Sequence, residues 1–141
     1  MADTKQSHIE DFYNSRFQVE QVWEYQTRLA DPKSTLHVLK VQRLYGTTVA
    51  VHVQVNGLNL KSVPKLKDGG TASHLPFSEE SIEASVTNLL SANQPLPEDY
   101  KEGYEIWYNA FMEGNAGVFT MPVARVVNMI EESMSGTDQS K

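Results

Sequence analysis

The sequence predicts a single α+β domain in which an antiparallel sheet from the first half of the chain is covered by helices from the second half. Residues 17–63 contain four segments that either alternate between apolar and polar positions or are rich in Leu and Val. Residues 79–134 carry apolar side chains at helical spacing. Because the strands precede the helices and do not alternate with them, the pattern favours this class over a doubly wound βαβ fold. We expect a four-stranded antiparallel meander packed against three C-terminal helices, or, as the alternative, a strongly curled, barrel-like sheet.

The first three strands are expected within residues 17–55. Apolar and polar residues alternate over 17–27, so that one face carries Phe17, Val19, Trp23 and Tyr25. Asp31-Pro32 begins a turn, because proline presets φ and aspartate can bond its own backbone. The second and third strands cover residues 36–44 and 48–55, joined by the short turn Tyr45-Gly46-Thr47.

The clearest local signal is Asn56-Gly57, a dipeptide typical of a two-residue type I′ hairpin in which both residues have positive φ. It predicts that the third strand turns back into a fourth over residues 58–63. The resulting register places four residues on the buried face: Val53, Val55, Leu58 and Leu60. The other face is expected to meet solvent, with His52, Gln54 and Asn59 on it.

Helices are expected after a long loop over residues 64–76, which is rich in proline and glycine. Ser78 fits the N-cap of the first helix, with Glu79 and Glu80 in the first turn, where the helix dipole favours anions. The apolar stripes of the three helices are Ile82, Val86, Leu89 and Leu90; Tyr100, Tyr104, Trp107 and Phe111, in a helix that begins near Pro97; and Val123, Val126, Val127, Ile130 and Met134, after a cap at Thr120.

The two ends of the chain complete the expected domain. Ser7-His8-Ile9-Glu10 fits a capping box that opens one or two helical turns at the N-terminus. We expect one domain over residues 1–135 and a flexible polar tail over residues 136–141.

Composition excludes several classes of function. The chain has 141 residues and no cysteine, which excludes disulfides, thiolate catalysis, zinc fingers and iron–sulfur clusters. No apolar run approaches the roughly 20 residues of a transmembrane helix. The first seven residues lack the apolar core of a secretion signal, so we expect a cytoplasmic protein.

Charge is unevenly distributed along the chain. Residues 1–70 have a net charge of +2 and residues 71–141 a net charge of −8. An acidic half argues against a nucleic-acid interface, which needs a basic face, and against an anionic membrane surface. It would attract a basic protein partner, although acidic helices can also serve solubility alone.

Motifs for catalysis are absent. The histidines His8, His37, His52 and His74 show none of the spacings of metal ligands, and there is no GxSxG, SxxK or P-loop motif. We therefore expect no metal, no cofactor and no catalytic residues. His74 is the most suggestive of the four, because it follows Ser73 at the end of the glycine-rich loop and precedes a helix N-terminus, where anions bind, although Glu79 and Glu80 already occupy that end.

Two hypotheses of function follow. The first is a protein-binding module, such as an inhibitor or antidote of a basic partner, that uses Glu79, Glu80, Glu102, Glu105 and Tyr108. Tyr108 is included because it lies about 100° around the helix from Trp107, off the apolar stripe. The alternative is a small-ligand-binding or hydrolytic domain whose site is the 64–78 segment around His74. The sequence leaves the oligomeric state open.

Overall fold

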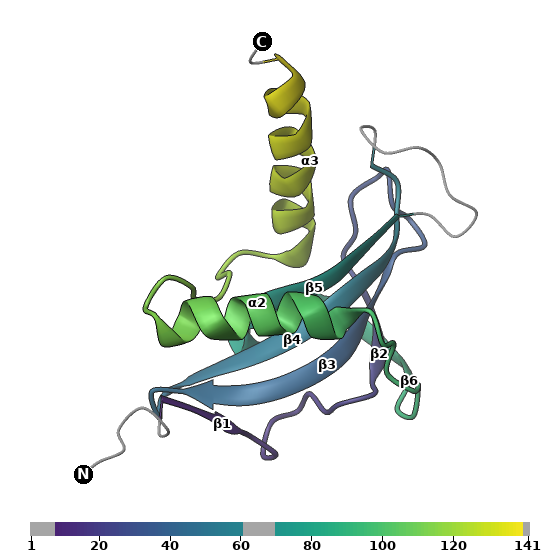
Figure 1. Ribbon diagram of the computed structural model, residues 1–141. Helices are drawn as coiled ribbons and strands as arrows, with labels where there is room; N and C mark the ends of the chain where they lie inside the picture. Colours follow the sequence, from purple (N-terminus) through teal and green to yellow (C-terminus); the bar gives the residue numbers. More distant parts are fainter. Residues whose placement is uncertain (1–7, 61–69, 140–141) are drawn as a thin grey trace.

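A computed structural model describes residues 8–60 and 70–139, with side chains described up to residue 133 (Figure 1). In these described residues six strands form one antiparallel sheet that is accompanied by three helices, so the predicted α+β class is confirmed. The sheet has more strands than the predicted four and is not closed into a barrel. The elements are β1 (Ile9–Asp11), β2 (Val22–Tyr25), β3 (Thr35–Leu44), β4 (Thr48–Leu58), β5 (Gly70–Ser78), α1 (Glu79–Ser85), β6 (Val86–Ser91), α2 (Tyr100–Met112) and α3 (Val123–Gln139).

The sheet is built around the β3–β4 hairpin, and its strand order is β5-β4-β3-β2-β6. The predicted turn at Tyr45-Gly46 is confirmed, with φ of 53° and 73°, the two consecutive positive values that a type I′ turn requires. β1 and β2 both pair with β3 but along different parts of it, since Ile9 lies opposite Leu44 and Val22 opposite His37. The edge of β3 is therefore shared between two short strands.

The predicted hairpin at Asn56-Gly57 is wrong. β4 continues through both residues to Leu58, and its next partner along the chain, β5, begins at Gly70. Gly57 does have a positive φ of 74°, but it lies where the β4–β5 register shifts between Val55 and Leu58. A bulge uses a left-handed glycine as readily as a type I′ turn does, so the dipeptide alone does not distinguish the two. The rest of the expected fourth strand, residues 61–63, lies outside the described residues.

Helices cover both faces of the central strands, as Figure 1 shows for α2, which lies across the sheet. One face of β4 carries Val51, Val53 and Val55 into a core that includes residues of α1 and α3. The opposite face lies under α2, so His52 is 0% exposed and Gln54 only 5%. The expectation that these two residues meet solvent is therefore wrong, because the sheet is covered on both sides.

The segment expected as a loop followed by one long helix folds differently. Residues 70–76 of the expected loop belong to β5, and residues 64–69 lie outside the described residues. Ser78 is the N-cap as predicted, and its Oγ accepts from the Ser81 amide at 3.1 Å. The helix ends at Ser85, because the next residues pair with β2 as β6, with Val86 opposite Tyr25.

The apolar stripes of the last two helices agree with the sequence, but α2 begins at Tyr100 and α3 at Val123, later than the expected start near Pro97 and the expected cap at Thr120. The N-terminal segment does not agree with the sequence. In α2 the predicted stripe supplies the buried residues Tyr100, Trp107 and Phe111, and Gly114 follows with φ of 81°. The buried residues of α3 are Val123, Val126 and Val127. The predicted helical turns at the N-terminus are wrong, since Ile9–Asp11 is a strand. α3 extends to Gln139, and the flexibility of the tail stays a prediction. In the described part of the chain, no helix is long and apolar enough to cross a membrane.

Candidate functional site

Two histidines form a hydrogen-bonded chain beneath α2. His52 Nδ1 lies 2.9 Å from His74 Nε2, and His52 Nε2 lies 2.9 Å from Gln42 Oε1. Because the amide oxygen can only accept, His52 carries its proton on Nε2 and accepts at Nδ1 from His74. The Gln42 amide nitrogen donates in turn to Tyr104 Oη at 2.9 Å. The chain of bonds therefore has one direction and joins β5, β4 and β3 to α2.

Aromatic rings and close backbone packing enclose this chain. The His52 ring meets Tyr104 and Trp107 edge-on, with centroid distances of 5.2 and 4.7 Å. Gly103 brings α2 down onto His74, since a Cβ at this glycine would lie 3.1 Å from the Cβ of His74. α2 can approach the sheet this closely only because residue 103 has no side chain.

Burial keeps both histidines uncharged at neutral pH. It lowers the pKa of His74 to about 4. It lowers the pKa of His52 well below the ordinary value, and the nearby His74 and Lys40 lower it further. With its Nε2 committed to His52 and with so low a pKa, His74 is a weak base, and the arrangement serves to fix α2 on the sheet.

The structure does not bring the predicted site residues together. His74 faces α2, whereas Glu79 and Glu80 begin α1, which packs with the core on the other face of the sheet. Glu79 accepts from Ser15 Oγ at 2.6 Å, and Glu80 is exposed. Ser73 is half-buried beside His74 on β5. Residues 70–78 are thus a strand and do not close over a helix N-terminus.

Glu102 and Glu105 do lie together, on the solvent side of α2. The same side carries Glu113 and Ile106, whose side chain is 65% exposed. Tyr108 is half-buried at the flank of the helix, where its ring lies 6.1 Å from that of Tyr104. It therefore supports the helix and is not on the outer face.

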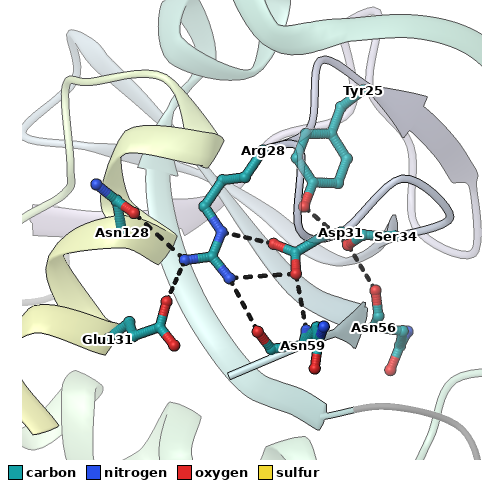
Figure 2. Close-up of polar contacts among 8 residues, drawn as sticks. All are labelled: Tyr25, Arg28, Asp31, Ser34, Asn56, Asn59, Asn128 and Glu131. Carbon is teal, nitrogen blue, oxygen red and sulfur yellow. Dashed lines mark hydrogen bonds and ion pairs between the residues drawn. The ribbon is translucent and has the colours of Figure 1, made fainter. Parts of the chain in front are cut away.

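A second polar cluster ties α3 to the sheet (Figure 2). Arg28 donates from Nε and Nη2 to both carboxylate oxygens of Asp31, at 2.7 and 3.1 Å, and from Nη1 to Glu131 at 2.6 Å. Further bonds reach Asn128 Oδ1 and the Asn59 carbonyl, both at 3.3 Å. All five N–H groups of the guanidinium thus have partners, so Arg28 acts as a cross-link and not as a free anion site.

Asp31 is the buried centre of this cluster. It is 1% exposed, and besides Arg28 it accepts from the Asn59 amide at 2.7 Å. The sequence shows Asp31 only as a turn residue, and nothing in the local pattern indicates its burial or a partner so distant along the chain. For His52 and Gln42 a signal did exist, because Tyr and Trp in a helix stripe carry polar atoms that need partners when buried.

No cluster of three or more potential metal ligands occurs within the described residues 8–60 and 70–139. Comparison of the chain with protein-family models, with curated proteins and with solved structures finds no match.

Proposed function

We propose that this protein is a protein-binding module that docks a basic partner on the outer face of α2, and that it covers the partner's surface as an inhibitor or antidote does. The observation that supports the proposal is the composition of this face. Glu102, Glu105 and Glu113 lie on the same exposed side of the helix as Ile106, and none of the three carboxylates forms an ion pair within the described part of the chain. We call these four residues the α2 face.

The α2 face is held rigidly from beneath. Trp107 and Phe111 stack at a centroid distance of 5.1 Å on the opposite side of the helix, and Trp107 Nε1 donates to the Gly117 carbonyl at 2.8 Å. The histidine chain anchors Tyr104 in the same way. A helix fixed at several points loses little freedom when a partner docks, which favours affinity.

The arrangement of the α2 face matches the anatomy of protein interfaces. An exposed aliphatic side chain at the centre supplies apolar contact area, and charged residues around it form a polar rim. The net charge of −8 in residues 71–141 adds a field that steers a basic partner toward this half of the chain.

The alternative of a hydrolytic or ligand site around His74 has less support. Such a site needs a base of suitable pKa next to a nucleophile and an open space for the substrate. Burial lowers the pKa of His74 to about 4, Nε2 is bonded to His52, and Gly103 packs directly against the side chain.

The test compares charge reversal on two helices. The variant Glu102→Lys/Glu105→Lys alters the α2 face, and the control Glu80→Lys reverses an exposed charge on α1. Partners are captured from native lysate with wild-type protein and both variants, and the proteins recovered are quantified by mass spectrometry. Association kinetics of any partner found are then measured at two salt concentrations.

The proposal predicts a basic partner that the control retains and the double reversal loses. The double reversal should slow association, and salt should slow it for wild-type protein, because exposed charges are screened beyond about 8 Å at physiological ionic strength. Thermal stability should barely change, since exposed charges contribute little to folding. A partner whose binding ignores both salt and the reversal would refute this role for the α2 face.

A further inference from the structure

A pocket lies at the edge of β3, between the part that pairs with β1 and the part that pairs with β2. Segment 12–21, which connects β1 to β2, leaves the sheet and returns to it. Its ends are fixed by the Phe12 amide, which donates to the Val41 carbonyl at 2.9 Å, and by the Glu20 amide, which donates to the Val38 carbonyl at 3.0 Å. Between these two hydrogen bonds, the pairing of β3 with β4 shifts its register at Leu39. This half-open pocket has a volume of about 380 Å³, within the usual range for small-molecule sites.

The walls of this pocket are more apolar than polar. The apolar side chains come from segment 12–21, from β3, from the connection before α2 and from the first residue of α2: Phe12, Val19, Leu39, Leu96 and Tyr100. Two lining side chains are unusually exposed for apolar groups, Tyr13 at 77% and Val19 at 42%. Apolar groups left in water beside a cavity are typical of a ligand site.

Two opposite charges line the same pocket without pairing. The ammonium of Lys40 lies 5.1 Å from the centroid of the Tyr104 ring, and no carboxylate within the described residues forms an ion pair with it. From the described residues Asp11 accepts two long hydrogen bonds, each 3.4 Å, from Gln42 Nε2 and Tyr13 Oη. Both charges therefore keep the capacity to bind a ligand.

We propose that this pocket binds a free apolar α-amino acid. Lys40 receives the α-carboxylate, Asp11 receives the α-ammonium, and the side chain of the ligand lies against Phe12, Leu39 and Tyr100. A simple anion would meet the carboxylate of Asp11, and a simple cation would meet the ammonium of Lys40. A zwitterion with an apolar body satisfies both charges and the walls together.

The site is independent of the α2 face. Its lining comes from Asp11 of β1, segment 12–21, β3 and residues 96 and 100, whereas the α2 face begins at Glu102 and points to solvent. Binding of an amino acid therefore neither requires a protein partner nor tests for one.

The experiment is a titration of isotopically labelled full-length protein followed by amide chemical shifts. Phenylalanine and leucine are the probes. N-acetylphenylalanine removes the ammonium, phenylalaninamide removes the carboxylate, and alanine removes the apolar body. Saturable shifts are expected for the two probes at residues 11–20 and 38–41. Each analogue should bind at least about tenfold more weakly than the probes, because it lacks either one charge-assisted hydrogen bond or the buried side chain.

Two variants assign the contacts. Lys40→Gln should weaken the binding of phenylalanine by about tenfold or more. It should not further weaken the binding of phenylalaninamide, because this analogue already lacks the carboxylate. Asp11→Asn should show the converse pattern with N-acetylphenylalanine. Lys101→Gln, which removes an exposed lysine outside the pocket, is the control and should bind like wild type.

Three results would overturn the proposal. These are no saturable shifts with either probe up to about 10 mM, equal binding of the probes and all analogues, or shifts confined to residues outside the pocket. All three are read on wild-type protein, so they hold even if a variant folds poorly.

Discussion

Mild acidification should destabilise the protein through the buried pair His52 and His74. In the unfolded chain each histidine takes up a proton near its ordinary pKa of about 6.5. In the folded protein burial lowers the pKa of His74 to about 4 and that of His52 well below the ordinary value. The unfolded state therefore binds more protons below pH 6.5, so stability is complete above that pH and is lost as the pH falls toward about 4.

The size of the effect follows from proton linkage. One extra proton bound by the unfolded state changes the free energy of unfolding by about 1.4 kcal/mol per pH unit. His74 is partly exposed, and discounting its shift for solvent screening leaves about 1 kcal/mol between pH 7.5 and 5.5. His52 adds to the loss in the same direction. Against a typical total of 5–15 kcal/mol, such a change is readily measured.

Urea unfolding at several pH values between 7.5 and 5.5 measures this effect, above the range in which carboxylates ordinarily titrate. The wild type is compared with His74→Gln and with His8→Gln, which removes a histidine outside the chain of bonds. His74→Gln should flatten the slope of the free energy of unfolding against pH, whereas His8→Gln should not. Parallel slopes for wild type and His74→Gln would refute the argument that a buried, neutral His74 is linked to folding.

Three further predictions concern stability. Arg28→Met should destabilise by about 3 kcal/mol in chemical denaturation, because it leaves the carboxylate of Asp31 buried without its partner; a loss under about 1 kcal/mol would contradict this. Val53→Ala should lower the free energy of unfolding by about 1–3 kcal/mol, because it creates a cavity. Gln54→Ala should lower it by about 1 kcal/mol, because it removes a hydrogen bond to Asp99. A Gln54→Ala variant as stable as wild type would mean that α2 does not cover this face of the sheet. Gly57→Val should lower the free energy of unfolding by more than about 1 kcal/mol, because φ is 74° and a Cβ would lie 3.2 Å from a backbone atom. An unchanged urea midpoint would exclude this conformation of Gly57.

The sequence predicted correctly those features that depend on residues close to one another along the chain. The Ser78 cap, the turn at Tyr45-Gly46 and the buried stripe of α2 depend on neighbouring residues, and all three were predicted correctly. The hydrophobic stripe from Ile82 to Leu90 was misread as one helix, because a short apolar run fits a strand equally well and only pairing with β2 decides between them.

The candidate site was harder to predict because it depends on contacts distant in sequence. Alternation along β4 correctly separated His52 and Gln54 from the valines, but it could not show that a helix covers the polar side as well. The pairing of His52 with His74 likewise requires the β4–β5 register, and the glycine-rich stretch between them suggested a loop. The acidic residues of α2 were found because charge and helical spacing are both local properties.

The position of β6 in the sheet has a consequence for the order of folding. β3 and β4 are joined by a tight turn, so their pairing needs little chain to be brought together. β2 can pair with β6 only after residues 86–91 have been synthesised, because Trp23 pairs with Leu89 and Tyr25 with Val86. Until then the nascent chain presents an unpaired strand edge beside the aromatic ring of Trp23, a feature that promotes association between chains. We expect protein truncated before residue 86 to aggregate during synthesis, and we expect β2 amides to gain protection from hydrogen exchange later than those of the β3–β4 hairpin.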